Sequence, residues 1–455
     1  MEFHHIDYSI APKQMFRKIC ALENPVWLDS GKPASPQSRY DILTALPQQI
    51  LAAENTNADD VERFISAAQS LLDSFKTSAQ STTCPFQGGL IGFWGYDLFT
   101  GNTSLEKPGD IDFPKACLGL YLWAIIYDHH RQSASMVIHP ECDTNTRKTI
   151  RDLLAGTTLS GADNEFRLTS AFEASENKEK YFRAIGKIKD YIRAGDVYQV
   201  NYAQHFQATY LGDTSAAYLS QRNLHPAPFS AYIGFNGKAV LSHSPEEFLS
   251  VLGREVQTQP IKGTAPRAKD PKIDQRNADV LQASDKDRAE NLMIVDLLRN
   301  DLGKACVPGS ISVPKLFELQ SFSNVHHLVS KVRGSLADNV SILQLMRHCH
   351  PGGSITGAPK KRAMEIIDEL ETRSRSLYCG SIGYISLCGH SHTSIAIRTM
   401  IADGAHIHCW GGGGIVADSD TEKEYQETLF KVGPMMHSLE KSYLDKTRQL
   451  SPSAK

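Results

Sequence analysis

Short β-strand patterns joined by glycine turns are the feature of this sequence that most restricts its fold. Apolar runs at 229–235 and 239–242 flank Gly237, and Gly253 precedes a further run at 256–261. A turn of this length can join antiparallel strands, whereas parallel strands need a crossover of a dozen or more residues. The pattern therefore predicts an α+β chain with large antiparallel sheets.

Helical periodicity alternates with these strands. Apolar residues recur at helical spacing at 59–75 and again from Tyr181 to Ile192, where Gly195 is suited to end the helix. A Thr-, Ser- and Gly-rich segment at 156–178 shows little periodicity, so we expect the main boundary there. Further patterns predict strands at 118–128, 135–139, 198–201, 379–387 and 392–399, and helices at 286–299, 360–370 and 422–438.

Composition excludes several classes of function. The 455 residues include 48 basic and 51 acidic side chains, so we expect no nucleic-acid partner. The longest apolar run, 118–126, is too short to span a bilayer as a helix, and no signal peptide is evident, so no membrane association is expected. The nine cysteines are far apart and form no Cys-x-x-Cys pair. We therefore expect a cytoplasmic protein without disulfides.

Two predicted helices each carry carboxylates three residues apart. Asp287 and Glu290 lie on the first helix, and Glu424 and Glu427 lie on the second. Residues at this spacing share a helix face, so each helix can direct two oxygen ligands at a hard cation such as Mg²⁺. A solvated helix face is the alternative. The nearly apolar run 292–298 argues against it, because it predicts that the first helix is buried.

Glycine-rich segments offer backbone N–H groups to an anion. Residues 411–414 are all glycine, and Lys431 lies one helical turn after Glu427, so a cation and a carboxylate could share that site. The stretch 351–360 is also rich in glycine but lacks the Gly-Lys-Ser/Thr ending of a phosphate loop. Binding of a nucleoside triphosphate is therefore not expected.

Three further side chains have roles that their neighbours leave open. Lys262 follows an apparent strand, where it is either a surface lysine before a turn or a buried amine that loses its proton readily. Glu246 fits a turn carboxylate or a general acid, and His327 fits the core or a catalytic site. Histidines also alternate in three pairs, and without further ligands nearby we expect no metal there. The pairs are His348/His350, His390/His392 and His406/His408.

A series of short motifs follows in order between about residues 176 and 440. They are 198–201 (Tyr-Gln-Val-Asn), 244–246 (Ser-Pro-Glu), 260–264 (Pro-Ile-Lys-Gly-Thr), 287–291 (Asp-Arg-Ala-Glu-Asn), 351–360, 395–399 (Ile-Ala-Ile-Arg-Thr) and 412–419. Together they resemble the chorismate-utilising enzyme family, and the residues before them resemble its accessory half. We therefore expect an accessory part at 1–160, a chorismate-binding catalytic part at 176–440 and a polar tail at 441–455.

The resemblance implies two antiparallel sheets packed as a sandwich, with helices outside and the N- and C-terminal parts intertwined. It implies that Glu290 and Glu427 bind Mg²⁺ directly, while Asp287 and Glu424 hold metal-bound water. The metal would grip the ring carboxylate of chorismate. The substrate-binding positions implied for this dianion are Thr356, Tyr384, Arg398, Lys431 and the backbone N–H groups of Gly412, Gly413 and Gly414.

Lys262 favours one branch of the family. Anthranilate and isochorismate synthases are similar in having alanine at this place, whereas the p-aminobenzoate branch commonly has lysine. The resemblance thus implies attack of neutral Lys262 on ring carbon 2, departure of the carbon 4 hydroxyl with Glu246 as general acid, and addition of ammonia at carbon 4. His327 is expected near the ring in a role that is not fixed. An anthranilate synthase and a catalytically silent chorismate-binding subunit are the alternatives.

The resemblance also implies a glutaminase partner that supplies ammonia. None of the cysteines lies in the Gly-x-Cys-x-Gly elbow of the associated glutamine amidotransferases. Two positions depart from the family pattern, because Glu247 stands where arginine is usual and His392 where aspartate is common. Residues 38–41 (Ser-Arg-Tyr-Asp) occupy the region of a segment associated with tryptophan feedback in anthranilate synthases, and regulation stays open.

Overall fold

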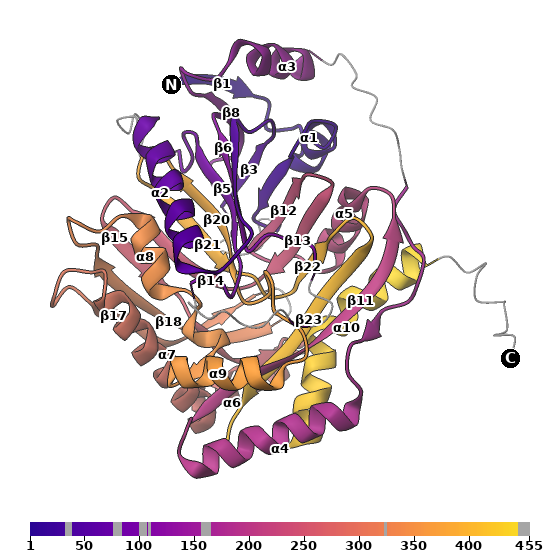
Figure 1. Ribbon diagram of the computed structural model, residues 1–455, viewed down its shortest axis with the longest axis vertical. Coiled ribbons are helices and arrows are strands. Elements are labelled where there is room, and N and C mark those ends of the chain that lie inside the picture. Colours follow the sequence, from indigo (N-terminus) through magenta and orange to yellow (C-terminus); the bar gives the residue numbers. More distant parts are fainter. Residues whose placement is uncertain are drawn as a thin grey trace, which may run out of the picture.

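The computed structural model describes residues 1–31, 39–75, 84–99, 107, 111–155, 165–322 and 325–444. Within these residues two large antiparallel sheets form the centre of the molecule, and helices lie outside them (Figure 1). The predicted α+β class is confirmed. Part of the predicted boundary segment, 156–164, and most of the predicted tail, 445–455, lie outside the described residues.

The larger sheet has 13 strands among the described residues. Its strand order is β1 (Glu2–Ile6), β8 (Ser133–Ile138), β7 (Trp123–Asp128), β3 (Tyr40–Thr44), β2 (Val26–Asp29), β12 (Phe229–Phe235), β13 (Lys238–Ser244), β22 (Thr399–Ala402), β23 (His406–Ile415), β11 (Gln199–Leu211) and β10 (Glu173–Ala174), with β19 (Gly357–Ala358) and β9 (Arg167–Leu168) also on β11. N-terminal β2 pairs directly with β12, so both parts of the chain share this sheet.

The smaller sheet has 10 strands among the described residues. Its order is β16 (Ile261–Pro266), β18 (Val325–Ser335), β15 (Glu255–Thr258), β14 (Glu247–Leu252), β21 (Ser391–Ile395), β20 (Ser381–Ser386), β5 (Gly89–Trp94), β6 (Ala116–Tyr121) and β4 (Gln49–Ala53), with β17 (Ser312–Ser321) on β18. Here N-terminal β5 pairs with β20. The expectation of intertwined parts is therefore confirmed in both sheets.

Aromatic side chains from both sheets meet in the core between them. The ring of Phe93 on β5 lies 5.4 Å from that of Phe235 on β12, and Phe113 packs 5.2 Å from each. All three residues are buried. Burial of such large apolar surfaces is the main stabilising contribution to a two-layer fold.

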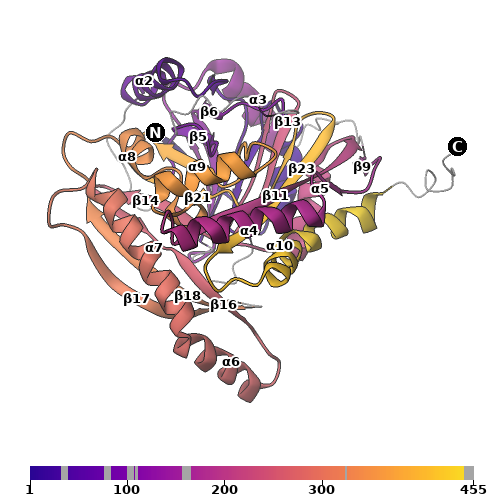
Figure 2. The same ribbon diagram turned by 60° about the horizontal axis from the view of Figure 1, so that its bottom comes forward.

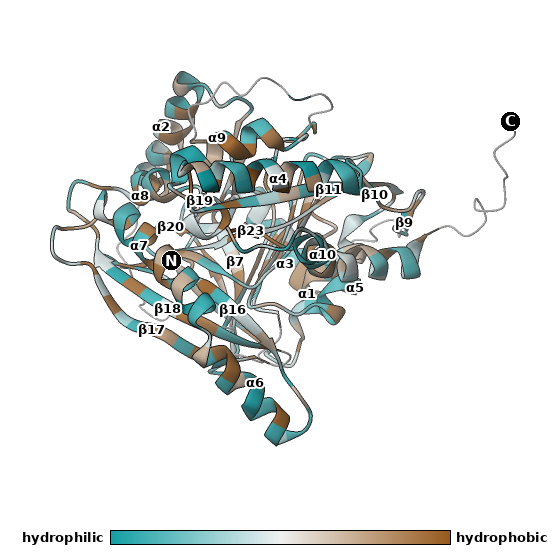
Figure 3. Ribbon diagram, turned by 90° about the horizontal axis from the view of Figure 1, so that it is seen from below, coloured by the Kyte–Doolittle hydropathy of each residue, from teal (hydrophilic) through white to brown (hydrophobic). Residues whose placement is uncertain are grey.

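The helices cover the outside of the sheets, and Figure 2 shows α6 and α7 lying along β16, β17 and β18. Figure 3 shows a largely hydrophilic outer face on α4. As predicted, Gly195 ends α4, with a φ of +84° that favours glycine. The helices are α1 (Pro12–Ile19), α2 (Ala58–Ser74), α3 (Thr144–Leu154), α4 (Lys178–Ala194), α5 (Thr214–Leu224), α6 (Pro271–Ala283), α7 (Asp285–Gly303), α8 (Ile342–Cys349), α9 (Lys360–Leu370), α10 (Thr421–Tyr443) and the 3₁₀ turn η1 (Gly353–Ile355).

Two segments predicted as single strands each pass from one sheet to the other. The run 118–128 divides at Leu122 into β6 and β7, and the run 392–399 divides into β21 and β22. These predictions were wrong because the apolar pattern continues through the point where the backbone leaves one ladder and joins the next. We call such a point a sheet crossing.

A third sheet crossing, at Pro245 and Glu246, joins β13 to β14. It lies beside the crossing between β21 and β22, because β13 pairs with β22 in one sheet and β14 pairs with β21 in the other. The two crossings bring Glu246 and Arg398 to the same end of the sandwich.

None of the helices within the described ranges combines the length and apolar character needed to span a membrane.

Candidate active site

Backbone hydrogen bonds hold the two neighbouring sheet crossings together. The N–H of Ile395 donates to the carbonyl of Glu246 at 3.1 Å, and the N–H of His243 donates to the carbonyl of Arg398 at 3.0 Å. Arg398 has a φ of +50°, which marks the sharp change in chain direction. Within the described residues its guanidinium makes no hydrogen bond or ion pair, so this cation is available to an anionic ligand.

Lys262 and Glu246 are linked through Ser354. The Ser354 hydroxyl donates to Glu246 Oε1 at 2.7 Å, and Lys262 Nζ lies 3.5 Å from the Ser354 carbonyl oxygen. Ser354 is the middle residue of η1, so the glycine-rich stretch 351–360 places it between the two charged groups. Glu246 is only 7% exposed, which makes it a buried carboxyl rather than a solvated turn residue.

Burial shifts both groups toward their neutral forms. It raises the pKa of Glu246 to about 7, against the opposing effects of the Ser354 hydrogen bond and the charge of Lys262. Burial also lowers the pKa of Lys262, and the positive charge of Lys431 acts in the same direction. The carboxylates of Glu246, Glu290 and Glu427 oppose that pKa shift. A proton donor and a deprotonatable amine are thus held at one site, on either side of Ser354.

The carboxylate pairs lie near the N-terminal ends of α7 and α10. Ser284 caps α7 by accepting the N–H of Asp287 at 3.2 Å, and Asp420 caps α10 by accepting the N–H of Lys423 at 3.0 Å. Asp287 and Glu424 therefore lie in the first turns, where the helix dipole favours negative charge.

Glycines bring both helices close to the sheets. A Cβ atom at Gly263, directly after Lys262, would lie 3.0 Å from Asp287 Cβ. One at Gly413 would lie 3.2 Å from Glu424 Oε2 and 3.7 Å from Lys431 Nζ. The predicted site residues of α7 and α10 are therefore brought against the strands that carry Lys262 and the glycine run.

Lysines partly neutralise these carboxylates. Lys431 Nζ lies 2.7 Å from Glu427 Oε1 and donates to the Gly412 carbonyl at 2.9 Å, while Lys286 Nζ lies 3.9 Å from Glu290. Burial would raise the pKa of Glu427, but the charge and hydrogen bond of Lys431 outweigh it and the pKa is lowered. Burial raises the pKa of Glu424, and Glu424 Oε1 accepts a hydrogen bond from the Ser419 hydroxyl at 2.7 Å.

The first carboxylate helix is less buried than predicted. Leu292 is 52% exposed, whereas Ile294, Val295 and Leu298 are buried. The expectation of a buried helix was wrong because α7 packs only one side against β16 and β18 and leaves Leu292 in solvent. Its carboxylates are partly exposed, so water can reach them.

The donor set of the four carboxylates fits Mg²⁺. In the part of the chain that the structure describes, only residues away from these carboxylates form a group of three candidate ligands within 4.8 Å. Mg²⁺ needs no such group, because it commonly takes one or two protein carboxylates and completes its shell with water and substrate oxygens. Glu290 and Glu427 both lie within electrostatic range of Lys262, because the charge of each raises the pKa of this lysine.

Two of the predicted substrate-binding residues, Tyr384 and Thr356, make other contacts within the described residues. Tyr384 lies against Phe86, 5.7 Å between rings, and lines a cavity of about 350 Å³ with Arg39 and His392. The structure does not bring it to Lys262, and the sequence could not show which side of β20 the ring occupies. The Thr356 hydroxyl donates to the carbonyl of Gly352 at 3.0 Å, so it holds its own loop.

The glycine run, which was expected to offer backbone N–H groups to an anion, lies within a β-strand. Residues 411–414 lie within β23 and pair with β11. A Cβ atom at Gly412 would lie 2.3 Å from the Tyr202 carbonyl oxygen, and one at Gly414 would lie 2.7 Å from Gln199 Nε2. These glycines allow close strand and side-chain approach within the sheet, which the sequence pattern did not separate from anion binding.

His327 lies on β18 beside the strand of Lys262. Its Nδ1 is 2.9 Å from the Thr264 hydroxyl, and burial lowers its pKa to about 4. A neutral imidazole at this place can hydrogen-bond but carries no charge at neutral pH.

The two departures from the family pattern are partners. Glu247 Oε2 lies 3.2 Å from His392 Nε2, and Gln257 and Gln259 each donate to Glu247 Oε1 at 3.2 Å. Burial would raise the pKa of Glu247, but His392 outweighs it and the pKa is lowered. The side chains at these two positions therefore contact each other in this chain.

Sequence reasoning missed a buried ion pair below η1. Arg375 is 2% exposed and donates to both Glu371 oxygens, at 3.0 and 2.7 Å. It also donates to the carbonyls of Ile355 at 3.0 Å and Asn201 at 2.6 Å. Only the four-residue spacing of Glu371 and Arg375 could have indicated the pair, and that spacing is common on solvated helices.

A half-buried amine near a protonatable carboxyl, with further carboxylates and an unpaired arginine on neighbouring elements, defines an enzyme site for a small anionic substrate. A family model for chorismate binding enzyme matches residues 23–437. The chain belongs to this family of chorismate-utilising enzymes.

Individual relatives agree with this assignment. Aminodeoxychorismate synthase component 1 of Escherichia coli (strain K12) is 43% identical over 438 residues, which cover 94% of this chain and 95% of that protein. Anthranilate synthase component 1 of Bacillus caldotenax is 32% identical over 450 residues, covering 91% of this chain and 89% of that protein. The crystal structure of anthranilate synthase component I from Streptococcus pneumoniae TIGR4 matches with a TM-score of 0.77 and 30% identity, covering 88% of this chain and 93% of that one.

Proposed function

We propose that this chain is an aminodeoxychorismate synthase component 1. It aminates chorismate at ring carbon 4 to give 4-amino-4-deoxychorismate for p-aminobenzoate and folate biosynthesis. The observation that carries the proposal is the half-buried amine of Lys262, linked through Ser354 to the protonatable carboxyl of Glu246. The higher identity to the Escherichia coli synthase component, 43% against 32% for the Bacillus caldotenax anthranilate synthase, supports the same choice.

The first half of the reaction uses both groups. Neutral Lys262 attacks ring carbon 2, the ring double bonds shift, and the carbon 4 hydroxyl leaves as water with the proton of Glu246. The proton lost by the alkylated amine returns to the Glu246 carboxylate. The lowered pKa of Lys262 and the raised pKa of Glu246 supply the forms that this step needs.

The second half restores the enzyme. Ammonia adds at carbon 4, the double bonds shift back, and the bond from carbon 2 to Lys262 breaks. One proton passes from the new amine to the departing lysine, so the sum is chorismate plus ammonia giving aminodeoxychorismate plus water. The unpaired guanidinium of Arg398 and the amine of Lys431 are suited to hold the substrate carboxylates through these steps.

Mg²⁺ belongs to the proposal as a cofactor that neutralises the ring carboxylate of the substrate. Glu290 and Glu427 would hold it directly, with Asp287 and Glu424 holding its water ligands, since both pairs supply partly exposed carboxylate oxygens. The metal would add positive charge beside carboxylates that Lys286 and Lys431 already contact.

A separate glutaminase subunit supplies the ammonia in this proposal. The relatives named component 1 imply a second component, and none of the cysteines of this chain lies in an amidotransferase elbow. All nine cysteines, each within the described residues, are free, which suits a reducing cytoplasm.

Product analysis tests the proposal. The purified chain is incubated with chorismate, Mg²⁺ and an ammonium salt, and the product is identified by mass spectrometry. We expect 4-amino-4-deoxychorismate. Anthranilate as the main product, or no conversion of chorismate, would overturn the proposal.

Trapping tests the covalent step. Without ammonia, a peptide containing Lys262 should become heavier by one dehydrated chorismate. Lys262→Ala should lose this adduct, whereas Lys269→Ala, which changes an exposed lysine seven residues further on, should keep it. An adduct that persists in Lys262→Ala would contradict the assignment.

A further inference from the structure

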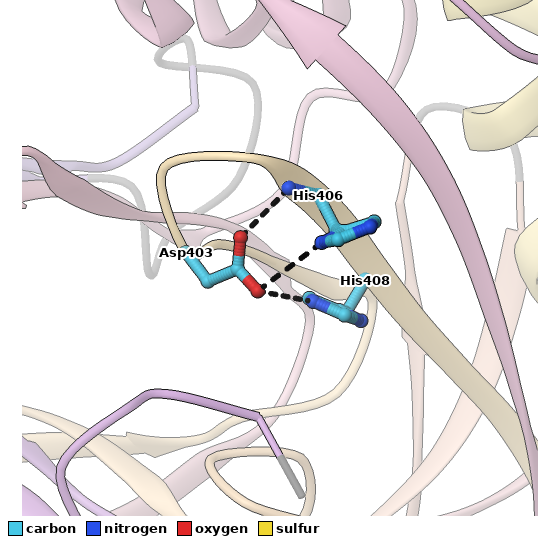
Figure 4. Close-up of side chains that lie close together, drawn as sticks. All are labelled: Asp403, His406 and His408. Atoms are coloured by element: carbon cyan, nitrogen blue, oxygen red, sulfur yellow. Dashed lines mark hydrogen bonds and ion pairs between the residues drawn. The ribbon is translucent and has the colours of Figure 1, made fainter. Parts of the chain in front are cut away.

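A compact group of three possible metal ligands lies at the β22–β23 hairpin, and it includes none of the residues of the candidate active site around Lys262. Asp403 Oδ2 is 3.0 Å from His408 Nε2 and 3.6 Å from His406 Nδ1. The carboxylate faces both imidazole rings (Figure 4). Among the described residues this is the one group of three whose candidate ligand atoms all lie within 4.8 Å of one another.

The hairpin backbone fixes the carboxylate in this position. Asp403 Oδ1 accepts the N–H of Ala405 at 2.9 Å and that of His406 at 2.7 Å. Oδ2 is thereby directed at the rings, and the two histidines share one face of β23 because they are two residues apart. The Asp403 and His408 side chains are 12% and 4% exposed and that of His406 is 42% exposed, so the group opens to solvent on the His406 side.

A second layer of hydrogen bonds supports His408. Its Nδ1 lies 3.0 Å from His205 Nε2 on β11, and His205 Nδ1 lies 2.6 Å from the Ser175 hydroxyl. When His408 Nε2 carries a hydrogen and donates to Asp403, His205 Nε2 donates to His408 Nδ1 and the Ser175 hydroxyl donates to His205 Nδ1. If both histidines change tautomer, His408 Nε2 becomes a free ligand while Nδ1–H donates to His205 and His205 donates to Ser175. No net proton is lost from the two rings, and an outer hydrogen bond of this kind is typical of metal-binding histidine.

We propose that Asp403, His406 and His408 form a binding site for Zn²⁺, distinct from the carboxylate pairs of the active site. Ligands 2.0–2.1 Å from a tetrahedral zinc ion lie about 3.4 Å apart, close to the two separations measured from Asp403. Two imidazoles and one carboxylate suit zinc, whereas the oxygen-only set of Glu290 and Glu427 suits Mg²⁺. The exposed side leaves the fourth position to water.

The sequence did not indicate this site because it supplied only the pair His406 and His408. The third ligand, Asp403, enters through the turn, whose backbone folds the carboxylate back over the strand. The buried His205 comes from a strand some 200 residues earlier in the chain, and its role is visible only in the sheet.

Calorimetric titration tests the proposal. The full chain is freed of metal with a chelator, supplied with excess Mg²⁺ to occupy the oxygen-only carboxylates, and titrated with Zn²⁺. We expect one equivalent of zinc to bind and to raise the Tm, since a ligand that binds only the native state stabilises it. Absence of binding would overturn the proposal.

Variants identify the ligands. His406→Ala removes the most exposed ligand, and Asp403→Asn keeps the acceptor for the hairpin N–H groups while it removes the negative charge. Both should lose the zinc equivalent and the rise in Tm. His348→Ala, an exposed histidine on α8, should keep both. Unchanged zinc binding in His406→Ala would contradict the assignment, and loss of binding in His348→Ala would place the ion elsewhere.

Discussion

Two pairs of oppositely charged residues in the interior of this enzyme differ in how many hydrogen bonds they make. Arg375 donates to Glu371 and to two backbone carbonyls, and its guanidinium lies 4.6 Å over the ring of Tyr96. Lys262 makes a single long contact of 3.5 Å, and Glu246 accepts one hydroxyl. The first pair has its polar groups satisfied within the protein, whereas the second leaves capacity for a substrate.

The difference shows how burial leads either to structure or to chemistry. A buried charge with a full set of partners stays charged and fixes the segments around it. With few partners, the same burial shifts the pKa and makes proton transfer accessible. Loss of a charge from the first pair should therefore reduce stability, and loss from the second should reduce activity.

Lys262→Ala should give the largest effect and is the sharpest way to break this comparison. Without the nucleophile, turnover of chorismate with ammonia should fall by roughly 10⁴-fold or more. The free energy of unfolding should change by less than about 1 kcal/mol, because few contacts are lost. Turnover assays and urea denaturation measure the two quantities. A strongly destabilised variant would show that Lys262 contributes mainly to stability and would contradict the comparison.

Arg375→Ala should show the opposite outcome. Removing the guanidinium leaves Glu371 buried without its counter-ion, which costs about 3–5 kcal/mol of unfolding free energy. The double variant Glu371→Gln/Arg375→Met should lose less, because no charge is left unpaired and glutamine can still accept the N–H of Ala203. Denaturation of the three proteins checks this order. A single variant as stable as the native chain would remove the distinction between the pairs.

Glu427→Gln extends the comparison to the solvated rim. The substitution keeps the size of the side chain but removes a proposed direct ligand, so turnover at limiting Mg²⁺ should fall by more than the roughly 10–100-fold expected for outer-sphere ligands. Asp287→Asn should stay within that range. Glu422→Gln, on the exposed side of α10, should behave like the native chain. Near-normal turnover of Glu427→Gln at limiting Mg²⁺ would refute the metal assignment.

Ser354→Ala should have the smallest effect, on the pH profile. Glu246 must be protonated to act as an acid, so kcat/KM should decline as pH rises through its pKa of about 7. The Ser354 hydroxyl lowers this pKa, and the variant should shift the alkaline decline to higher pH. The acid side should remain where protonation of Lys262 sets it. A pH profile that does not shift would show that Ser354 does not set the pKa of Glu246.

The raised pKa of Glu246 also makes the free energy of unfolding depend on pH. Because the folded pKa of Glu246 lies above its ordinary value, the folded protein binds this proton more tightly than the unfolded chain. Its stabilising contribution is therefore complete below the ordinary glutamate pKa and is lost as pH rises through about 7. Glu246→Gln should remove that part of the pH dependence of unfolding.

The sequence predicted element types better than their membership of a sheet. Helix α9 has the bounds expected from its periodicity, and Gly195 ends α4 as expected. The runs 118–128 and 392–399 failed because a continuous apolar pattern contains no sign of the crossing between ladders. Periodicity reports which residues are buried, and both sheets bury them equally.

The residues of the candidate site were likewise predicted only in part from the sequence. Local motifs indicated Lys262, Glu246 and the carboxylate helices, and in the structure Lys262 and Glu246 both contact Ser354. Ser354 was missed because the fold brings it to two residues that lie about a hundred positions earlier in the chain. The motif around Tyr384 indicated its strand but not the cavity that its ring lines.

The interleaved sheets have a consequence for synthesis of the chain on the ribosome. Strands β2 and β5 each emerge with one edge unpaired, and the partner of β5, β20, follows about 290 residues later. At translation speeds of 5–20 residues per second this is a delay of roughly 15–60 s, during which an apolar strand edge is open to other nascent chains. Chaperones that shield exposed strands should therefore matter more for the yield of this enzyme than its final stability does.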